Sequence, residues 1–395
     1  MVGDALSMND LGPLGAAATE TAFKFGIEEE FFVSSADKRD AARTRMGPFV
    51  EAAKARFGEA VQREMLEPQL EVVTPPASDF AETRGRLARL RRGIGELARE
   101  HGLIVMAAGT HPLAVWTRQR ATRGARYGRL MHDLQMLGSR NMVCGLHVHV
   151  EVPDLAARVD LMNRMMPYLP LFLALSTSSP FWQAQRTGLL GYRLAAYREL
   201  PRTGLPELFA DAADYERYVA TLVEARAIEN SSFVWWMIRP SLKHPTLELR
   251  AADSCTRLDD ALAIAALYRC LVRHLVRTPE LNRGLTGASR GIVAENCWRA
   301  QRYGIHGSFV DEAGRTAKPV AEILEEVLAR VTPDATALGC RAELDLARDV
   351  LARGTSADRQ LALYMEALGR GLSNREALAE VVDSLAAQTC SDAAV

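Results

Sequence analysis

The chain has 395 residues and a formal net charge of −1, with 48% hydrophobic and 25% charged residues. These proportions are typical of a globular protein with a packed core, and the near-zero charge gives no support for binding of nucleic acid or of an anionic membrane surface. No apolar run reaches the roughly 20 residues of a membrane span. Six cysteines occur without a CxxC pair and no signal peptide is recognisable, so we expect reduced thiols in a cytoplasmic protein.

The first half of the chain alternates short apolar runs with segments of helical spacing. Residues 1–20 mix Gly, Ala and polar residues without periodicity, and we expect a flexible leader followed by a single domain over residues 21–395. Ser78 is expected to cap the second helix and Gly102 to end it. The predicted elements are a strand over 23–33, a helix over about 46–58, a strand over 69–74, a helix over about 79–100 and a strand over 103–109.

The middle of the chain repeats this mixture, and the last third is helical. We predict a strand over 143–152, a long helix over about 154–178, a loop containing Pro180, Pro201 and Pro206, and a strand near 245–252. Helical spacing then recurs over 257–277, 318–331, 340–353, 358–370 and 374–388, and SNRE at 373–376 has the pattern of a capping box. The order of elements predicts an α+β fold with a helical portion from about residue 257.

The first predicted strand, FKFGIEEEFFV, carries three carboxylates among apolar residues. Residues two apart share a face of a strand, so Glu28 and Glu30 point to one side while Glu29 points to the other with Ile27 and Phe31. A buried face with two ionised carboxylates is costly unless a cation is present. We expect Glu29 to reach solvent at a sheet margin or to pair with an arginine, and Glu29→Gln to cost little activity.

Three further predicted strands also combine an apolar face with a polar one. If the four strands pair into one sheet, their polar faces converge on oxygen ligands with some imidazole nitrogen, which suits Mg²⁺ or Mn²⁺. The chain has neither a GxxxxGK[ST] nor a GxGxxG loop, so metals and arginines would have to hold the phosphates of any bound nucleotide. The three polar faces carry His147, His149 and Glu151 in CGLHVHVEV, Glu248 and Arg250 in TLELRAAD, and Gln69 and Glu71 in EPQLEVVT.

Each of these patterns also has a plain structural interpretation. Glu28 and Glu30 could form a solvated strand face, and Glu248 with Arg250 an ordinary surface pair. His147 and His149 could be hydrogen-bonded structural residues, or the HxH pair of a metal-dependent hydrolase of the amidohydrolase type. That alternative function needs further histidines and an aspartate at later strand ends.

A set of motifs in fixed order resembles the carboxylate-amine ligases related to glutamate-cysteine ligase. The resemblance implies the fold of the glutamine synthetase superfamily, with a curved, largely antiparallel sheet whose concave face forms the active site. It also implies that ATP and Mg²⁺ convert the side-chain carboxylate of glutamate to an acyl phosphate, which an amine such as that of cysteine attacks. The motifs are GIEEEF (26–31), QLEVVTPP (69–76), GTHP (109–112), CGLHVHV (144–150), SSPFW (178–182), TGLLGYR (187–193), RTGLP (202–206), RP (239–240), TLELRAAD (246–253) and ENCWRAQRYG (295–304).

The resemblance also implies roles for individual residues. The acceptor amine stays open, and a homodimer is expected on general grounds. The implied metal ligands are Glu28, Glu30, Glu64, Glu71, His147 and Glu248; the catalytic contacts are Arg250, at the transferring phosphoryl group, and Arg193, at the acceptor or phosphoryl region; the substrate-binding residues are His149, Gln69 and Arg239; and the nucleotide-binding residues are Arg299 and Arg302.

Overall fold

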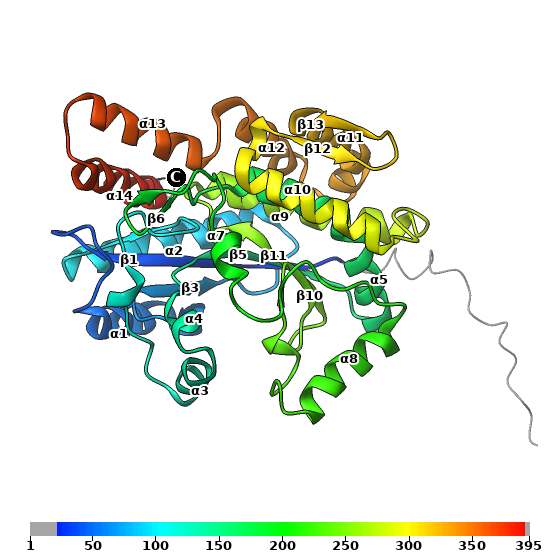
Figure 1. The fold of residues 1–395 in the computed structure, drawn as a ribbon, viewed down its shortest axis with the longest axis horizontal. Coiled ribbons are helices and arrows are strands. Elements are labelled where there is room, and N and C mark those ends of the chain that lie inside the picture. Colours follow the sequence, from blue (N-terminus) through cyan, green and yellow to red (C-terminus); the bar gives the residue numbers. More distant parts are fainter. Residues whose placement is uncertain (1–21, 392–395) are drawn as a thin grey trace, which may run out of the picture.

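A seven-stranded antiparallel sheet forms the centre of the computed structural model, which describes residues 22–391 (Figure 1). The predicted leader over residues 1–20 lies outside the described residues. The strand order is β10-β11-β5-β1-β3-β2, and β4 also pairs with β1. The strands are β1 (Phe25–Ser35), β2 (Val61–Arg63), β3 (Gln69–Val73), β4 (Leu103–Met106), β5 (Gly145–Glu151), β10 (Ile238–Pro240) and β11 (Thr246–Asp253).

Helices make up most of the remaining described chain, which confirms the predicted α+β class with a helical C-terminal portion. They are α1 (Met46–Phe57), α2 (Phe80–Glu100), α3 (Ala125–Leu134), α4 (Met136–Ser139), α5 (Leu155–Met165), α6 (Leu169–Ser176), α7 (Arg193–Tyr197), α8 (Ala212–Glu224), α9 (Leu258–Arg277), α10 (Gly287–Tyr303), α11 (Val320–Leu338), α12 (Arg341–Arg353), α13 (Ser356–Gly369) and α14 (Asn374–Ser391). No helix within residues 22–391 is both long and apolar enough to cross a membrane.

Shorter elements connect these parts. The 3-10 helices are η2 (Gly58–Ala60), η3 (Trp116–Arg118), η4 (Met166–Tyr168), η5 (Ser231–Phe233) and η6 (Gly304–His306). Three small strand pairs join β6 (Phe181–Trp182) to β7 (Gln185–Arg186), β8 (Thr203–Gly204) to β9 (Trp235–Trp236), and β12 (Ser308–Asp311) to β13 (Thr316–Pro319). All six cysteines are free thiols, as expected from their spacing.

The four predicted polar strands do pair into one sheet, with β1 at its centre. Glu30 lies opposite Glu71 of β3, Glu28 lies opposite His147 of β5, and Glu248 of β11 lies opposite His149. Residues directly opposite each other in an antiparallel pair share a face. The register therefore gathers the carboxylates and imidazoles on a single side of the sheet.

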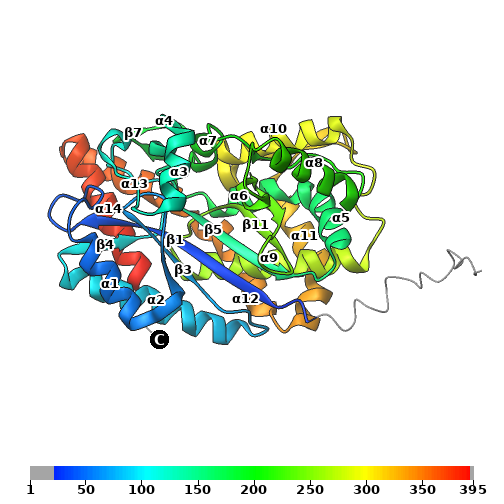
Figure 2. The ribbon, with the colours of Figure 1, turned by 90° about the horizontal axis from the view of Figure 1, so that it is seen from below.

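The other side of the sheet is apolar and covered by helices. Phe31, Leu70 and Val72 belong to a buried cluster that also includes Phe49 of α1 and Ile94 of α2. Farther along the sheet, α9 packs against β5. In Figure 2, α1 and α2 lie on one side of β1, and α3 and α8 lie on the other. The sheet thus separates a hydrophobic core from a polar face.

Several local predictions need correction. Asp79 caps α2 in place of Ser78, because its carboxylate accepts the N–H of Glu82, whereas Gly102 does follow the helix end with a φ of 66°. The long helix predicted over 154–178 is two helices, α5 and α6, joined by the 3-10 turn η4. Pro167 and Pro170 lie at the starts of η4 and α6, where a missing N–H costs least.

Other corrections concern helices that were not predicted. The region predicted as a loop after residue 178 contains α7 and α8, and α10 runs through the ENCWRAQRYG motif. The predicted capping box is confirmed, since Ser373 N donates to the carboxylate of Glu376 and Glu376 N donates to Ser373 Oγ.

Glu29 occupies the apolar side of the sheet, as the alternation predicts, but it does not reach solvent. It is 1% exposed and forms a bidentate ion pair with Arg91 of α2, with distances of 2.9 Å from Nε to Oε2 and 2.6 Å from Nη2 to Oε1. Arg91 also donates to the carbonyls of Cys255 and Thr256. Of the two expected alternatives, the arginine partner is therefore the one present, and the exposed sheet margin is not.

We predict that Glu29→Gln destabilises the protein by about 3–5 kcal/mol, because it leaves the buried guanidinium of Arg91 without its counter-charge. Urea unfolding followed by circular dichroism measures this change. Glu82→Gln is the matched control, since Glu82 pairs with Arg86 on an exposed helix surface and its loss should cost less than about 1 kcal/mol. Equal free energies of unfolding for the two variants would contradict a stabilising role for the Glu29–Arg91 pair.

Candidate active site

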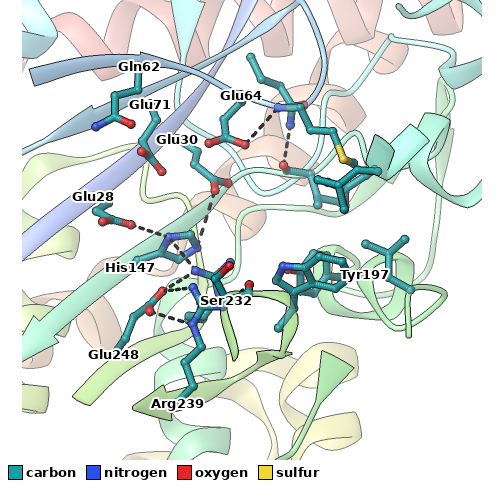
Figure 3. Close-up of a pocket in the computed structure, with 18 of the residues that line it drawn as sticks. Glu28, Glu30, Gln62, Glu64, Glu71, His147, Tyr197, Ser232, Arg239 and Glu248 are labelled. Carbon is teal, nitrogen blue, oxygen red and sulfur yellow. Dashed lines mark hydrogen bonds and ion pairs between the residues drawn. The ribbon is translucent and has the colours of Figure 1, made fainter. Parts of the chain in front are cut away.

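A cavity of about 300 Å³ opens on the polar face of the sheet (Figure 3). Its floor comes from the main sheet, and its walls come from α3, α7, η5 and the turn between β10 and β11. Eleven of the thirteen sequence-predicted site residues line it: Glu28, Glu30, Glu64, Gln69, Glu71, His147, His149, Arg193, Arg239, Glu248 and Arg250. The cavity is therefore the candidate active site.

Carboxylates crowd together at one end of the cavity. Glu30, Glu64 and Glu71 each place a carboxylate oxygen within 4.8 Å of the others. Glu28 and Glu71 form a second such group with His147, and Glu28 forms a third with His149 and Glu248. Glu28 and Glu71 each belong to two groups, so the three groups form one continuous set of oxygen and nitrogen donors.

The electrostatics of this end favour a bound cation. Burial and the neighbouring Glu30 raise the pKa of Glu64 to about 8, and burial together with Glu64 raises the pKa of Glu71 well above its ordinary value. For Glu28, burial works to raise the pKa, but the neighbouring imidazoles of His147 and His149 outweigh it and lower the pKa. A divalent cation would relieve the repulsion between these groups, and carboxylate oxygens are the ligands that Mg²⁺ and Mn²⁺ prefer.

The two histidines of β5 also fit a metal. His147 Nδ1 lies 3.1 Å from Glu28 Oε2, and its buried Nε2 has no hydrogen-bond partner although Glu30 Oε1 lies 3.7 Å away. Burial and the nearby Arg250 lower the pKa of His147, which favours the neutral ring that a metal requires. His149 Nδ1 contacts Thr246 Oγ1 at 2.9 Å, and its Nε2 also lacks a hydrogen bond, with Glu28 Oε1 3.3 Å away but poorly aligned.

Arginines gather at the other end of the cavity around Glu248. Arg239 binds both carboxylate oxygens of Glu248, at 2.8 and 3.2 Å, and Arg250 Nη1 binds Oε1 at 2.5 Å. Burial works to raise the pKa of Glu248, but Arg239 and Arg250 outweigh it and hold the pKa well below its ordinary value. Glu248 is therefore ionised. It orients the guanidinium groups of Arg239 and Arg250, and it also lies close to His149.

A β-bulge in β11 includes Arg250. The register between β11 and β5 shifts between Leu249 and Ala252, so that one extra residue of β11 stands opposite His147. Bulges of this kind re-aim side chains and are common beside active sites. At this bulge, Arg250 Nη1 lies 3.4 Å from His147 Nδ1, between the acidic and cationic ends of the cavity.

Two predicted residues lie outside the cavity lining. Arg299 bonds Glu295 at 3.1 Å and the carbonyl of Ser308 at 3.1 Å, and the exposed Arg302 packs over the ring of Tyr303. Their expected role in holding a nucleotide stays a prediction.

Other lining residues had no signal in the sequence motifs. They lie outside the four polar strands, in β2, β9, helices and turns, so alternation along those four strands does not single them out. They include Arg63, Tyr127, Tyr197, Ser232, Trp235, Lys243 and His244. Arg193 was predicted from the motif TGLLGYR, but the motif did not predict that this residue is buried, with only 2% of its surface exposed.

Comparisons with known proteins show which proteins this chain resembles. The family described as glutamate-cysteine ligase family 2 (GCS2) matches residues 24–384. A Bradyrhizobium diazoefficiens protein named "Putative glutamate--cysteine ligase 2" is 47% identical over 361 residues, which cover 91% of this chain and 84% of the relative. A Rhodospirillum rubrum protein of the same name is 46% identical over 374 residues, which cover 94% of this chain and 96% of the relative.

Solved structures share the fold at low sequence identity. A bifunctional glutathione synthetase from Pasteurella multocida superposes with a TM-score of 0.70 at 16% identity, over 95% of this chain and 53% of that chain. A glutamate–cysteine ligase from Francisella tularensis, solved in complex with AMP, gives 0.69 at 11% identity, over 94% of this chain and 90% of that one. The fold predicted from the resemblance is thereby confirmed. With the family matched over nearly its whole length and relatives almost half identical to it, this chain belongs to glutamate-cysteine ligase family 2.

Proposed function

We propose that the protein is an ATP-dependent carboxylate-amine ligase that activates the γ-carboxylate of glutamate as an acyl phosphate and joins it to an amine, such as that of cysteine. The observation that carries the proposal is the convergence of acidic groups and imidazoles from four strands on one cavity, directly beside buried arginines. Membership of the glutamate-cysteine ligase family supports the same reaction class.

The acidic end would hold Mg²⁺ or Mn²⁺. Glu30, Glu64 and Glu71 offer an all-oxygen group, and Glu28 with His147 extends it toward the arginines. A divalent cation bound there would neutralise charge on the polyphosphate of ATP and so reduce its repulsion of an anionic carboxylate.

The arginines of the cavity would also act on the charges of the polyphosphate and of the substrate carboxylate. Arg250 stands between the acidic end and Glu248, where it can contact a phosphoryl group as it moves to the carboxylate. The pairing of Arg239 and Arg250 with Glu248 fixes both guanidinium groups before substrate arrives, so little reorganisation is needed during the reaction. Their burial strengthens each interaction because the surroundings are less polar than water.

The alternative of an amidohydrolase-like enzyme finds less support. Such a site needs histidines beyond His147 and His149. His244 does lie at the cavity, but His274 pairs with Asp334 and His306 with Asp358, and neither lines it.

We predict that the purified protein releases ADP from ATP only when glutamate, a divalent cation and a suitable amine are all present. A coupled assay for ADP with a panel of amines, including cysteine, measures this dependence, and mass spectrometry identifies the amide product. Omission of each component in turn is the control. Metal-dependent hydrolysis of amides without any stimulated ADP release would contradict the ligase proposal and favour the hydrolase.

A second prediction concerns the metal. Mg²⁺ at millimolar concentration should raise the melting temperature of the wild-type protein, because it binds the folded cavity and not the unfolded chain. Glu71→Gln should abolish most of this increase, since it removes a ligand shared by two donor groups.

Glu59→Gln is the matched control for Glu71→Gln, because Glu59 lies in η2, is exposed and does not line the cavity. Its melting temperature should rise with Mg²⁺ as in the wild type. An undiminished increase in Glu71→Gln would show that the metal binds elsewhere.

A further inference from the structure

Ser179 is a fully buried residue in the segment that follows α6. Its N–H donates to the carbonyl of Leu190, and its carbonyl accepts the N–H of Tyr192. These two backbone hydrogen bonds pair the segment with the residues that lead directly into α7, whose first residue is Arg193. Ser179 is therefore tied to the start of α7, although 14 residues separate it from Arg193 in the chain.

The side chain of Ser179 joins Arg193 to Asp253. Its Oγ accepts the backbone N–H of Arg193 at 2.9 Å and donates to Oδ2 of Asp253 at 2.6 Å. The first N–H of a helix has no acceptor within the helix, and the side chain of Tyr192 does not cap α7. A hydroxyl has a single hydrogen, so its donation to the carboxylate turns its lone pairs toward the N–H of Arg193. Asp253 thus orients the hydroxyl of Ser179.

The guanidinium of Arg193 occupies a narrow space on the polar face of the sheet. Gly145 of β5 lies opposite Asp253 of β11, and a Cβ atom at Gly145 would lie 2.7 Å from Cζ of Arg193. The guanidinium therefore fills the space that a side chain at Gly145 would take. Its Nη1 donates to the carbonyl of Arg250 at 3.2 Å, and its buried Nε has no hydrogen-bond partner among the described residues. With so few bonds at its end, the side chain depends for its position on the backbone of Arg193.

We propose that Ser179 is a positioning residue, whose hydroxyl fixes Arg193 at the active-site cavity. The proposal rests on the ligase function proposed above, since the position of Arg193 matters for turnover only if this cavity is the catalytic site. Without the hydroxyl, the first N–H of α7 loses its acceptor and Asp253 loses a donor, and both groups are left buried with fewer hydrogen bonds. The start of α7 then shifts toward other partners, and the guanidinium moves with it.

The experiment compares Ser179→Ala with Ser178→Ala. Ser178 is the matched control, because it is equally buried and its Oγ also makes two hydrogen bonds. That Oγ accepts from Gly109 N at 2.7 Å and donates to the carbonyl of Ser254 at 2.8 Å, and neither bond involves α7. Urea unfolding of both variants measures the loss of stability that they share.

The first readout is the ¹H–¹⁵N NMR signal of the Nε–H group of Arg193, assigned by its disappearance in Arg193→Lys. We expect this signal to shift or broaden in Ser179→Ala and to stay in place in Ser178→Ala. Ser179→Cys should displace it as well, because a thiol of similar size is a weak acceptor, and it replaces the alanine variant if that variant does not fold. This readout needs no substrate.

The second readout is amine-dependent release of ADP. We expect kcat to fall about tenfold or more in Ser179→Ala, since a small displacement of a group at a catalytic site costs up to about 100-fold in rate. Ser178→Ala should turn over like the wild type. In the Arg193→Lys background, Ser179→Ala should cause no further loss, because two changes that act through the same residue are not additive.

The possible failures are distinguishable. An unmoved Arg193 signal in Ser179→Ala, or an equal displacement in Ser178→Ala, would overturn the positioning role and leave the ligase function standing. A displaced signal without loss of rate, or additive losses in the double variant, would overturn the role of Ser179 in turnover. A displaced signal together with a wild-type protein that shows no amine-dependent release of ADP would support the positioning of Arg193 and overturn the ligase function.

Discussion

Repulsion among carboxylates on one face of a sheet is the constraint on which the rest of this structure depends. Glu28, Glu30, Glu64 and Glu71 lie close enough that burial and mutual repulsion raise the pKa of Glu64 and Glu71. Such a cluster is unfavourable for folding unless a cation or a bound ligand compensates it. The fold tolerates it because the opposite face of the same strands packs against α1, α2 and α9. The apolar side of the sheet thus stabilises the fold, and the polar side carries the groups of the candidate active site.

The antiparallel register converts four separate sequence patterns into one site. Glu28 can meet His147, and Glu30 can meet Glu71, only if β1 pairs with β5 and β3 in the observed alignment. A shift of one residue would turn every one of these side chains into the hydrophobic core.

Glu30 lies between the part of β1 that pairs with β5 and the part that pairs with β4. There, Gly145 N donates to the carboxylate of Glu30 and Ser254 Oγ donates to its carbonyl. These two hydrogen bonds therefore hold Glu30 where the pairing of the strands is interrupted.

Much of the polar face could be predicted from sequence because the period of a strand is two and the polar residues keep to it. The sequence shows less directly which strands are neighbours. The convergence of the four polar faces on one cavity was therefore established only by the observed pairing of the strands. Glu29 shows the limit clearly: its direction follows from alternation, but its partner Arg91 is 62 residues away on α2 and no local pattern connects them. Tyr197 and Trp235 lie in short elements whose path depends on tertiary packing, and motifs alone do not identify them.

Capping and chain breaks show the same division between local and distant causes. The capping box at Ser373 is a local interaction and was predicted correctly. Whether Asp79 or Ser78 caps α2 depends on the residue at which the helical backbone begins. The break between α5 and α6 depends on the positions of two prolines in the turn between them. The helix α10 was missed because its apolar residues do not form a single stripe, although it carries a family motif.

We propose that the polar face of the sheet is a metal-dependent ligase site. Anomalous diffraction from crystals soaked with Mn²⁺ and the β,γ-imido analogue of ATP tests it most directly. We expect anomalous peaks within coordination distance of Glu28, Glu30, Glu64, Glu71 or His147, with the phosphates of the analogue between them and Arg250. Peaks only at other surface carboxylates, with no nucleotide density in the cavity, would contradict it.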